Sequence, residues 1–367
     1  MGPRSAGSLL VQNQSRTSPG AAASQRIHRA DLFLATPPKP GSSPNTSSNS
    51  TAIQQAAALP GQPSLGEAQA EAQGPGHPRL VQTPATERCG CDKGCVRETD
   101  SSDWFRQHFD PLQLPVLNST HILEPQALSW WLGLQSNADK QKLEEVMSQL
   151  FQVIPPPSLD LRPLPFRCHS CAVVGNSGNL RHSGHGKMID SHTSVFRMNK
   201  AVTSGFEEDV GNRTTHHFLY PESAVDIVGG ASLVLLPFKI RDLQWLTSAL
   251  STGTITMTYM RVKDRVKADK DKVLVVNPEF FKYCHDHWTE RHGRYPSTGL
   301  VALIFALHTC DQVSLYGYGA DKNGNWHHYW EENRFAGAFR KTGVHSAEYE
   351  TQIIHRLAQE HKITLHT

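Results

Sequence analysis

The sequence predicts an α/β domain with a mostly parallel, doubly wound sheet. Short runs that are apolar throughout alternate with segments long enough to form helices. Strands that are apolar on every residue are typical of a sheet buried on both faces, and the helices between them supply the crossovers that parallel strands need. Ligands of such sheets bind beyond the carboxyl ends of the strands. Functional residues are therefore expected just after the predicted strands.

The individual elements follow from the same pattern in chain order. Apolar residues recur every three to four positions from Trp104 to Leu150, which predicts a helical lead-in that Pro155–Pro157 ends. Beyond Cys168, strands are expected at residues 171–175, 232–237, 273–276, 313–316 and 363–365. Helices are expected at residues 242–250, 278–288, 298–309 and 347–361.

Residues 1–87 differ in composition from the rest of the chain. They are dominated by Ser, Pro, Ala, Gly, Gln and Thr, so they bury too little apolar surface to offset the entropy of ordering. We predict a disordered low-complexity stalk at 1–87 and one folded domain at 88–367. No apolar run before residue 88 approaches the roughly 20 residues of a membrane span, and no signal-peptide pattern is present. Read literally, such a chain would be cytosolic and would lack a membrane anchor.

The charged residues nearly balance one another. Lys and Arg number 36 against 34 Asp and Glu, which leaves a formal net charge of +2. Proteins that grip a nucleic-acid backbone carry a dense basic surface. We therefore expect no nucleic-acid partner.

Seven cysteines group along the chain as three, two and two. One interpretation is three disulfides with one cysteine left over, formed in an oxidising compartment. The other is a four-thiolate zinc site made of Cys91, Cys95, Cys168 and Cys171. The spacing favours neither. Glycosylation sequons at Asn118 and Asn212 agree with a lumenal compartment, although a three-residue pattern is common by chance.

Two segments have the character of phosphate-binding turns. The first predicted strand runs into Gly175–Asn179, a turn that tolerates unusual backbone angles and leaves amides free to meet an anion. A plain loop is an equally good interpretation, because the full G-x-G-x-x-G pattern is absent. The segment His292–Gly299 leads into an apolar helix that Ser297 or Thr298 could cap, with its free amides favouring a phosphate. A purely structural cap is the alternative.

Histidines provide the other candidate functional groups. In the segment Trp326–Trp330, two adjacent histidines are flanked by aromatic residues. Aromatic faces stack on sugars, and a protonated imidazole can hold a phosphate oxygen. His345 stands at the start of a predicted helix, five residues before Glu350. A structural role is the alternative for each of these histidines.

Taken together, four ordered segments resemble the large, small, third and very small sialylmotifs of animal sialyltransferases. These are Cys171–Glu222, His292–Ala320, His327–Trp330, and His345 with Glu350. Over about residues 88–367 the sequence resembles that of the β-galactoside α-2,3-sialyltransferases acting on Galβ1,3GalNAc, types one and two. The resemblance implies a Rossmann-like domain of the GT-A variant type. It also implies inverting transfer of sialic acid from CMP-sialic acid to the galactose 3-hydroxyl of glycoproteins or glycolipids.

The resemblance also assigns roles to individual residues. By similarity, His345 is the general base that deprotonates the galactose hydroxyl, and His328 contacts the CMP phosphate. The remaining donor or acceptor positions are Asn176, Asn199, Tyr259, Tyr295, Gly299, Gly319 and Gln135. Of these, Gln135 matches an acceptor contact.

The cysteine pairing and the expected absence of a metal come from the same resemblance. The family pairs the positions of Cys89 with Cys95, Cys91 with Cys168, and Cys171 with Cys310, which leaves Cys284 free. Because the donor is a monophosphate ester, no metal or other cofactor is expected. The only Asp-x-Asp candidate, Asp269–Asp271, is interpreted as a solvated loop.

One feature departs from the family pattern. Members are Golgi proteins held by an amino-terminal signal anchor, which the residues before Cys89 do not show. The resemblance implies a location in the Golgi. Two explanations for the missing anchor are then open: the amino terminus is an alternative or incomplete start, or this isoform is not an active Golgi enzyme. The alternative function is a catalytically inactive glycan- or nucleotide-binding relative. A dehydrogenase lacks its full glycine fingerprint here, and a serine hydrolase lacks its G-x-S-x-G elbow.

Overall fold

The structure is a computed structural model that describes residues 96, 101–135, 140–157, 168–321, 323–332 and 344–367. The predicted stalk at 1–87 lies outside these residues, as do Cys89, Cys91 and Cys95.

A seven-stranded parallel sheet forms the centre of the described residues. Its order is β5-β4-β3-β2-β1-β6-β7, and each neighbouring pair runs parallel. The strands are β1 (Ser170–Val174), β2 (Ser194–Met198), β3 (His216–Leu219), β4 (Ser232–Leu235), β5 (Val273–Val275), β6 (Gln312–Tyr316) and β7 (Thr364–His366). The chain runs from β1 outward to β5 and then returns to β6 on the other side of β1. The strand order therefore reverses between β1 and β6, and such a switch point is where doubly wound sheets bind ligands.

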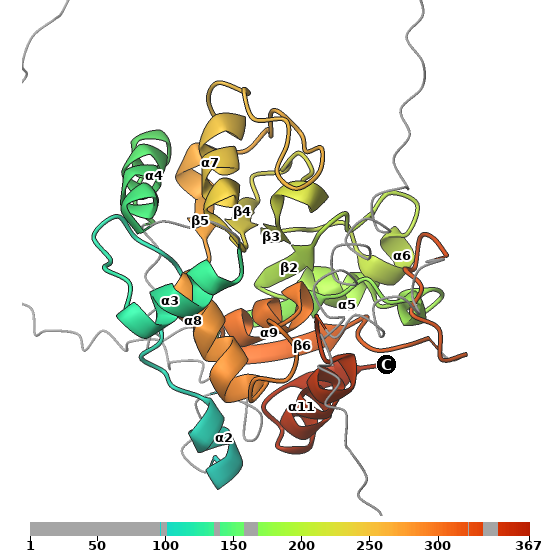
Figure 1. The fold of residues 1–367 in the computed structure, drawn as a ribbon. Coiled ribbons are helices and arrows are strands. Elements are labelled where there is room, and N and C mark those ends of the chain that lie inside the picture. The colour runs from blue at the N-terminus through green and yellow to red at the C-terminus, as the bar shows by residue number, and fades with distance from the viewer. Residues whose placement is uncertain (1–95, 97–100, 136–139, 158–167, 322, 333–343) are drawn as a thin grey trace, which may run out of the picture. The chain divides into compact units, whose positions relative to one another are not determined.

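Helices cover both faces of the sheet, as predicted (Figure 1). Those of two turns or more are α3 (Pro125–Gly133), α4 (Lys140–Val153), α7 (Ile240–Ala249), α9 (Thr298–Thr309) and α11 (Ala347–Gln359). Shorter helices are α2 (Asp103–His108), α5 (Gly186–Ser191), α6 (Glu207–Val210) and α8 (Pro278–Tyr283). In the part of the chain that the structure describes, no helix combines the length and apolar character needed to cross a membrane.

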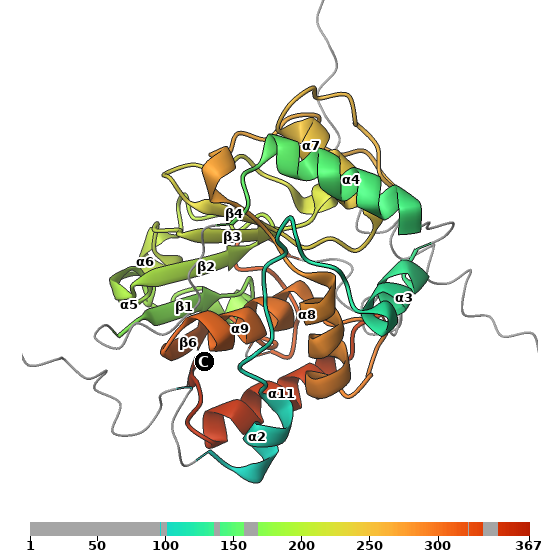
Figure 2. The same cartoon turned by 90° about the vertical axis from the view of Figure 1, so that its left-hand side faces the viewer.

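Two apolar cores lie on opposite faces of the sheet. Along β1, Cys171 and Val173 belong to the larger core, whereas Ala172 and Val174 belong to the smaller one. This alternation is what the pleat of a strand dictates. The larger core includes α9, which is buried from Leu300 to His308 and lies against the sheet (Figure 2). The smaller core includes residues of α5 and α6.

The sequence pattern does not predict β2 and β3, because both central strands carry polar residues. Arg197 of β2 is buried, and its guanidinium donates to the carbonyl of Val210 (2.6 Å) and to the carbonyl of Arg213 (3.1 Å). His217 of β3 pairs through Nε2 with the carbonyl of Asn199 (2.6 Å). A buried polar group without a hydrogen-bond partner destabilises the fold. Hydrogen bonds to backbone carbonyls offset this cost, so such residues are tolerated inside the sheet.

The structure adds detail to two of the predicted helical segments. The predicted helix at 278–288 is α8 followed by a π-helix at Cys284–Trp288, so the backbone changes its hydrogen-bond spacing at Cys284. The predicted helical lead-in consists of three helices, α2, α3 and α4. Periodicity alone detects neither break.

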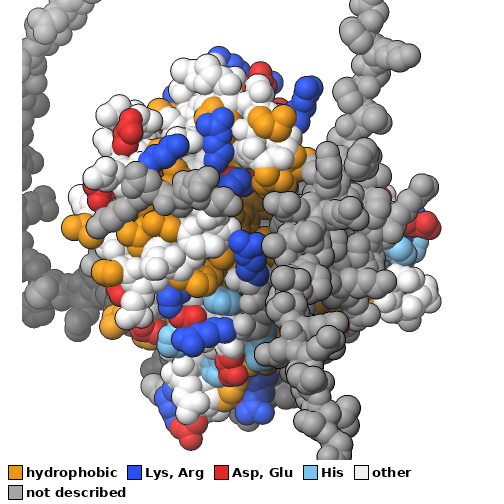
Figure 3. Space-filling view, in the orientation of Figure 1, with side chains coloured by type: hydrophobic (Ala, Val, Ile, Leu, Met, Phe, Trp, Pro, Cys, Tyr) orange, Lys and Arg blue, Asp and Glu red, His pale blue; other side chains and the backbone are white. Residues whose placement is uncertain are grey.

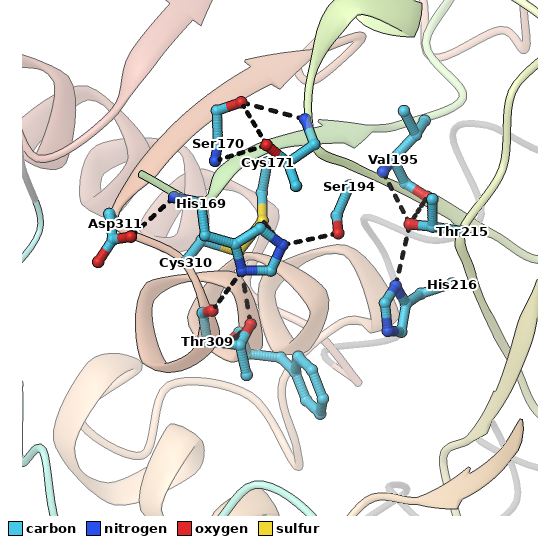
Figure 4. The surroundings of a disulfide bond; sticks show 12 residues. His169, Ser170, Cys171, Ser194, Val195, Thr215, His216, Thr309, Cys310 and Asp311 are labelled. Atoms are coloured by element: carbon cyan, nitrogen blue, oxygen red, sulfur yellow. Dashed lines mark hydrogen bonds between the residues drawn. A yellow bond between two sulfur atoms is a disulfide. The ribbon is translucent and has the colours of Figure 1, made fainter. Parts of the chain in front are cut away.

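A disulfide lies at the amino ends of β1 and β6, away from the carboxyl ends that lead to the switch point. Cys171 of β1 is bonded to Cys310, the residue that follows α9, as the resemblance implied (Figure 4). His169 packs beside it and pairs with the Thr309 carbonyl (3.0 Å). Cys168 is also disulfide-bonded, whereas Cys284 is buried and free. A zinc site with Cys168 and Cys171 as thiolate ligands is therefore wrong.

Candidate functional site

Two turns meet at the switch point, one after β1 and one after β6. The Gly175 amide donates to the Tyr316 carbonyl (2.7 Å), and the Ser177 amide donates to the Gly317 carbonyl (3.0 Å). A Cβ atom at Gly175 would lie only 2.3 Å from that Gly317 oxygen. Glycine is thus required at position 175, because any side chain would push the two turns apart.

Three asparagines place amide oxygens in this region. The Oδ1 atoms of Asn176, Asn179 and Asn199 are buried, and none has a hydrogen-bond partner among the described residues. The Nδ2 groups of Asn176 and Asn179 are engaged, with the carbonyls of Met198 (3.1 Å) and Tyr318 (2.8 Å). A buried acceptor without a partner is costly unless a ligand supplies a donor. Asn179 is not among the predicted site residues, although it belongs to the predicted turn.

His328 lies directly beside the first turn. It forms an antiparallel bridge with Ser177, and the Tyr329 amide donates to the Asn176 carbonyl (3.1 Å). Its ring stacks on Trp330, with centroids 4.6 Å apart and planes within 10°. Its Nδ1 lies 3.0 Å from the Glu331 carboxylate, which forms an ion pair with the ring when the ring is protonated. Trp330 and Glu331 therefore fix the orientation of the imidazole.

His345 is held against the segment that precedes α9. It forms a bridge with Gly293, and its Nδ1 lies 2.8 Å from the backbone carbonyl of Tyr295. A carbonyl can only accept, so Nδ1 carries the proton and Nε2 of the neutral ring is an acceptor. Burial lowers the pKa of His345, and the hydrogen bond to Tyr295 offsets part of this effect. The ring is therefore neutral near pH 7, as a general base must be.

The start of α9 is tied to the helix that follows His345. Ser297 caps α9 by accepting from the Leu300 amide (3.1 Å). Its amide donates to Glu350 Oε1 (2.8 Å), and its hydroxyl pairs with Oε2 (2.5 Å). Burial raises the pKa of Glu350 to about 7. The capping role predicted for Ser297 is confirmed, while the link from Ser297 to Glu350 is a contact that sequence does not reveal.

Tyr318 connects the two histidine regions. Its hydroxyl donates to the Gly299 carbonyl in the first turn of α9 (2.9 Å), while its own carbonyl accepts from Asn179. A Cβ atom at Gly299 would lie 3.1 Å from the Tyr318 ring. Gly319 follows with a positive φ of 88°, which favours glycine. The structure thus links the segments that hold Asn176, Gly299 and His328 through hydrogen bonds and close packing, and Gly319 follows Tyr318 in the same turn.

The predicted tyrosines and Gln135 lie on the α7 side of this region. The Tyr295 ring packs edge-on against His345, with centroids 5.0 Å apart, and burial raises the pKa of Tyr295 to about 12. Tyr259 is half exposed (49%). Gln135, at the end of α3, accepts from the Ile240 amide at the start of α7 (2.8 Å). Gln135 therefore has a structural role whether or not it also contacts a ligand.

Figure 3 shows the charge character of one face of the molecule. Lys, Arg and His side chains run down it from the α7 region towards α11, interspersed with apolar surface. Within the described residues, the one close group of three possible metal ligands is His169, Cys171 and Cys310, and two of these are joined as the disulfide. Asp269 of the Asp-x-Asp candidate accepts from the Asp271 amide as the cap of a short 3₁₀ helix.

The sequon asparagines both lie in loops. Asn118 Oδ1 accepts from the Thr120 amide (3.0 Å), and Thr120 is exposed. Asn212 is exposed, and its backbone amide donates to Asp190 (3.0 Å). Both positions are compatible with an attached glycan, which remains a prediction.

Known proteins are similar to this chain in sequence. Residues 116–362 match the family model described as Glycosyltransferase family 29 (sialyltransferase). CMP-N-acetylneuraminate-beta-galactosamide-alpha-2,3-sialyltransferase 2 of Mus musculus is 53% identical over 279 residues, which are 76% of this chain and 79% of that protein. The corresponding sialyltransferase 1 of Homo sapiens is 48% identical over 281 residues, which are 76% of this chain and 82% of that protein.

A solved structure agrees with the sequence comparison. The crystal structure of a mammalian sialyltransferase in complex with Gal-beta-1-3GalNAc-ortho-nitrophenol superposes with a TM-score of 0.70 at 45% identity, covering 76% of this chain and 99% of that one. The seven-stranded parallel sheet, the histidine segments and these likenesses agree with one another. The chain belongs to glycosyltransferase family 29, the sialyltransferases.

Proposed function

We propose that this enzyme transfers sialic acid from CMP-sialic acid to the 3-hydroxyl of a terminal galactose in Galβ1,3GalNAc, with inversion and without a metal. The names of the relatives support the donor, the linkage and the β-galactosamide acceptor. The disaccharide bound in the similar crystal structure supports the same acceptor.

The orientation of His345 is the observation that carries this proposal. With Nδ1 donating to the Tyr295 carbonyl, Nε2 is the acceptor for the galactose 3-hydroxyl proton. As that proton moves to Nε2, the hydroxyl oxygen bonds to the anomeric carbon of sialic acid from the face opposite CMP. The bond from that carbon to the phosphate oxygen breaks at the same time, and CMP departs with the electron pair. One displacement of this kind inverts the anomeric centre.

The other predicted residues are proposed to hold the donor and the acceptor. His328, when protonated, stabilises the negative charge that develops on the departing CMP phosphate. The unpartnered amide oxygens of Asn176 and Asn199 suit the amino and hydroxyl donors of a cytidine nucleoside. Gly299 and Gly319 allow the backbone to approach the nucleotide, Tyr259 and Tyr295 contact the donor, and Gln135 contacts the acceptor.

The proposed location is the Golgi lumen, with acceptors on glycoproteins or glycolipids. The disulfide between Cys171 and Cys310 supports an oxidising compartment, where such bonds persist. The predicted bridges from Cys89 to Cys95 and from Cys91 to Cys168 are part of the same proposal.

The decisive experiment supplies purified protein with labelled CMP-sialic acid and a panel of galactosides. We expect transfer to Galβ1,3GalNAc glycosides, weaker transfer to Galβ1,4GlcNAc, and products cleaved by an α-2,3-specific sialidase. Activity that survives exhaustive chelation supports the metal-free mechanism. Activity lost to chelation and restored by manganese would overturn that part, and an absence of transfer to every galactoside would overturn the whole.

A further inference from the structure

A buried ion cluster lies at the carboxyl ends of β3 and β4, next to Tyr259. Lys239 Nζ lies 2.6 Å from Asp242 and 3.3 Å from Glu222. The side chains are 19%, 0% and 4% exposed, in the order Lys239, Asp242 and Glu222. Charges removed from water in this way are tolerated only when they are paired. The ammonium group is thus fixed in place by two carboxylates that follow two different strands.

The backbone around this cluster is equally constrained. Asp242 accepts from the Phe238 amide (2.9 Å) and the Lys239 amide (3.2 Å), which caps α7. Two side chains from α3 and the residues just after it reach the same corner. The Trp131 indole donates to the Pro237 carbonyl (2.8 Å), and Gln135 accepts from the amide of residue 240. The corner is therefore a rigid platform rather than a loop that adapts to its surroundings.

Tyr259 sits at the tip of a tight turn that rests on this platform. Met257 and Arg261 pair as a bridge, and the Thr258 amide donates to the Met260 carbonyl (2.9 Å). Half of the Tyr259 surface is exposed. A turn of five residues with an exposed aromatic ring at its tip has no core of its own, so contacts with neighbouring elements must set the position of the ring.

Two side-chain contacts join the turn to the cluster. Lys239 Nζ lies 4.7 Å from the centroid of the Tyr259 ring, within the range of a cation–π interaction. The Thr258 hydroxyl hydrogen-bonds to Glu222, the carboxylate that also pairs with Lys239. Loss of hydration of the phenol and the nearby Glu222 carboxylate raise the pKa of Tyr259, which keeps it neutral and able to donate a hydrogen bond. The ring and its turn are both positioned by the cluster.

We propose that Lys239 is a positioning residue for the transferase reaction, acting through Tyr259 to hold that ring in the donor site. The inference rests on the proposed function, in which Tyr259 contacts CMP-sialic acid. Lys239 does not itself bind the anionic donor, because its ammonium group is already paired with two carboxylates. Glu222 and Thr258 take part in the same positioning, because Glu222 pairs with Lys239 and accepts a hydrogen bond from the Thr258 hydroxyl.

The test measures kcat and KM for each substrate in Lys239→Met, Lys239→Arg and Thr258→Val, with Lys272→Met as the matched control. Lys272 is exposed, and its ammonium donates to the Gly230 carbonyl (3.0 Å). We expect Lys239→Met to raise the donor KM at least fivefold and to change the acceptor KM less than twofold. Lys239→Arg, which keeps the charge and can stack on the ring, should recover most of the loss. The control should match the unmodified enzyme.

A double-mutant cycle with Tyr259→Ala separates positioning from a general structural role. If Lys239 acts through Tyr259, then Lys239→Met raises the donor KM no further in the Tyr259→Ala background. Equal fold-changes in both backgrounds would overturn the inference. Should Lys239→Met fail to fold, Lys239→Met with Glu222→Gln removes one charge of each sign, and Thr258→Val tests the turn without disturbing the ion pairs. A donor KM unchanged in Tyr259→Ala would instead refute the proposed donor contact.

Discussion

The Nδ1 atom of His345 lies 2.8 Å from the backbone carbonyl of Tyr295. This contact fixes the tautomer, because the carbonyl requires a proton on Nδ1 and so leaves the lone pair on Nε2. It also holds the His345 ring against the segment that leads into α9, which begins at Thr298, three residues after Tyr295. A substitution at position 345 should therefore affect chemistry far more than donor binding.

The first prediction concerns that substitution. His345→Ala should lower kcat by 10²–10⁴, the usual contribution of a general base, and should leave CMP affinity nearly unchanged. His355→Ala is the matched control, since His355 is exposed on α11. Single-turnover transfer of labelled sialic acid and CMP binding by calorimetry check the two parts. Near-normal transfer in His345→Ala would remove His345 from its catalytic role.

The pH dependence of the reaction should report the same group. Because the base must be neutral and burial lowers its pKa, protonation of His345 should not limit kcat/KM near pH 7 and should reduce it only below about 6.5, the ordinary value for histidine. The midpoint of the acid limb should lie below that value. Profiles between pH 4.5 and 8, with circular dichroism to confirm folding at each pH, check this expectation. An acid limb centred above pH 7 would contradict it.

The third prediction concerns the disulfide between Cys171 and Cys310, which closes a segment with a sequence separation of 139 residues. By the chain-entropy model, removing it should lower the free energy of unfolding by about 5 kcal/mol. Cys171→Ala with Cys310→Ala should shift the denaturant midpoint accordingly. Cys284→Ala, at the buried free cysteine, is the control and should cost far less. Equal midpoints for the double variant and the parent protein would contradict the structural importance of the bridge.

Sequence patterns predicted the parts of the fold whose residues are uniform in character. The helix at 298–309 is apolar on every side, and its predicted bounds are those of α9. Strands β1, β4 and β5 are mostly aliphatic runs, and the sequence pattern predicted them as well. Strands β2 and β3 were missed because Arg197 and the pair His216–His217 imitate surface residues. Arg197 and His217 are buried against the backbone carbonyls of Val210, Arg213 and Asn199, and no local pattern reveals these contacts.

The candidate site likewise contains some residues that local sequence predicts and others that it does not. The turn at 175–179 and the Ser297 cap follow from local sequence, while the roles of Asn199, Tyr259 and Gly319 came only from the family resemblance. The cluster of Lys239 with Glu222, like the pairing of Ser297 with Glu350, joins residues 17 and 53 positions apart. Contacts of this kind depend on the register of separate strands and helices. One sequence by itself does not encode them in any readable pattern.

The last prediction concerns Glu350, whose pKa is raised by burial from 4.5 to about 7. A carboxyl with a raised pKa contributes stability that is present below the unfolded pKa and is lost as pH rises through the folded one. Relative to a neutral side chain, Glu350 should therefore lower the free energy of unfolding by up to about 3 kcal/mol as pH rises from 4.5 to above 7.

Glu350→Gln keeps the shape and the hydrogen bond from the Ser297 amide but cannot ionise. We expect it to melt at a higher temperature than the parent above pH 7, and the advantage should shrink towards pH 4.5. Glu350→Ala should be destabilised at every pH, because the Ser297 amide then loses its acceptor. Thermal unfolding of the three proteins across this range checks both expectations. An advantage of Glu350→Gln that is independent of pH would show that Glu350 has the same pKa in the folded and unfolded protein, and it would contradict the pKa raised by burial.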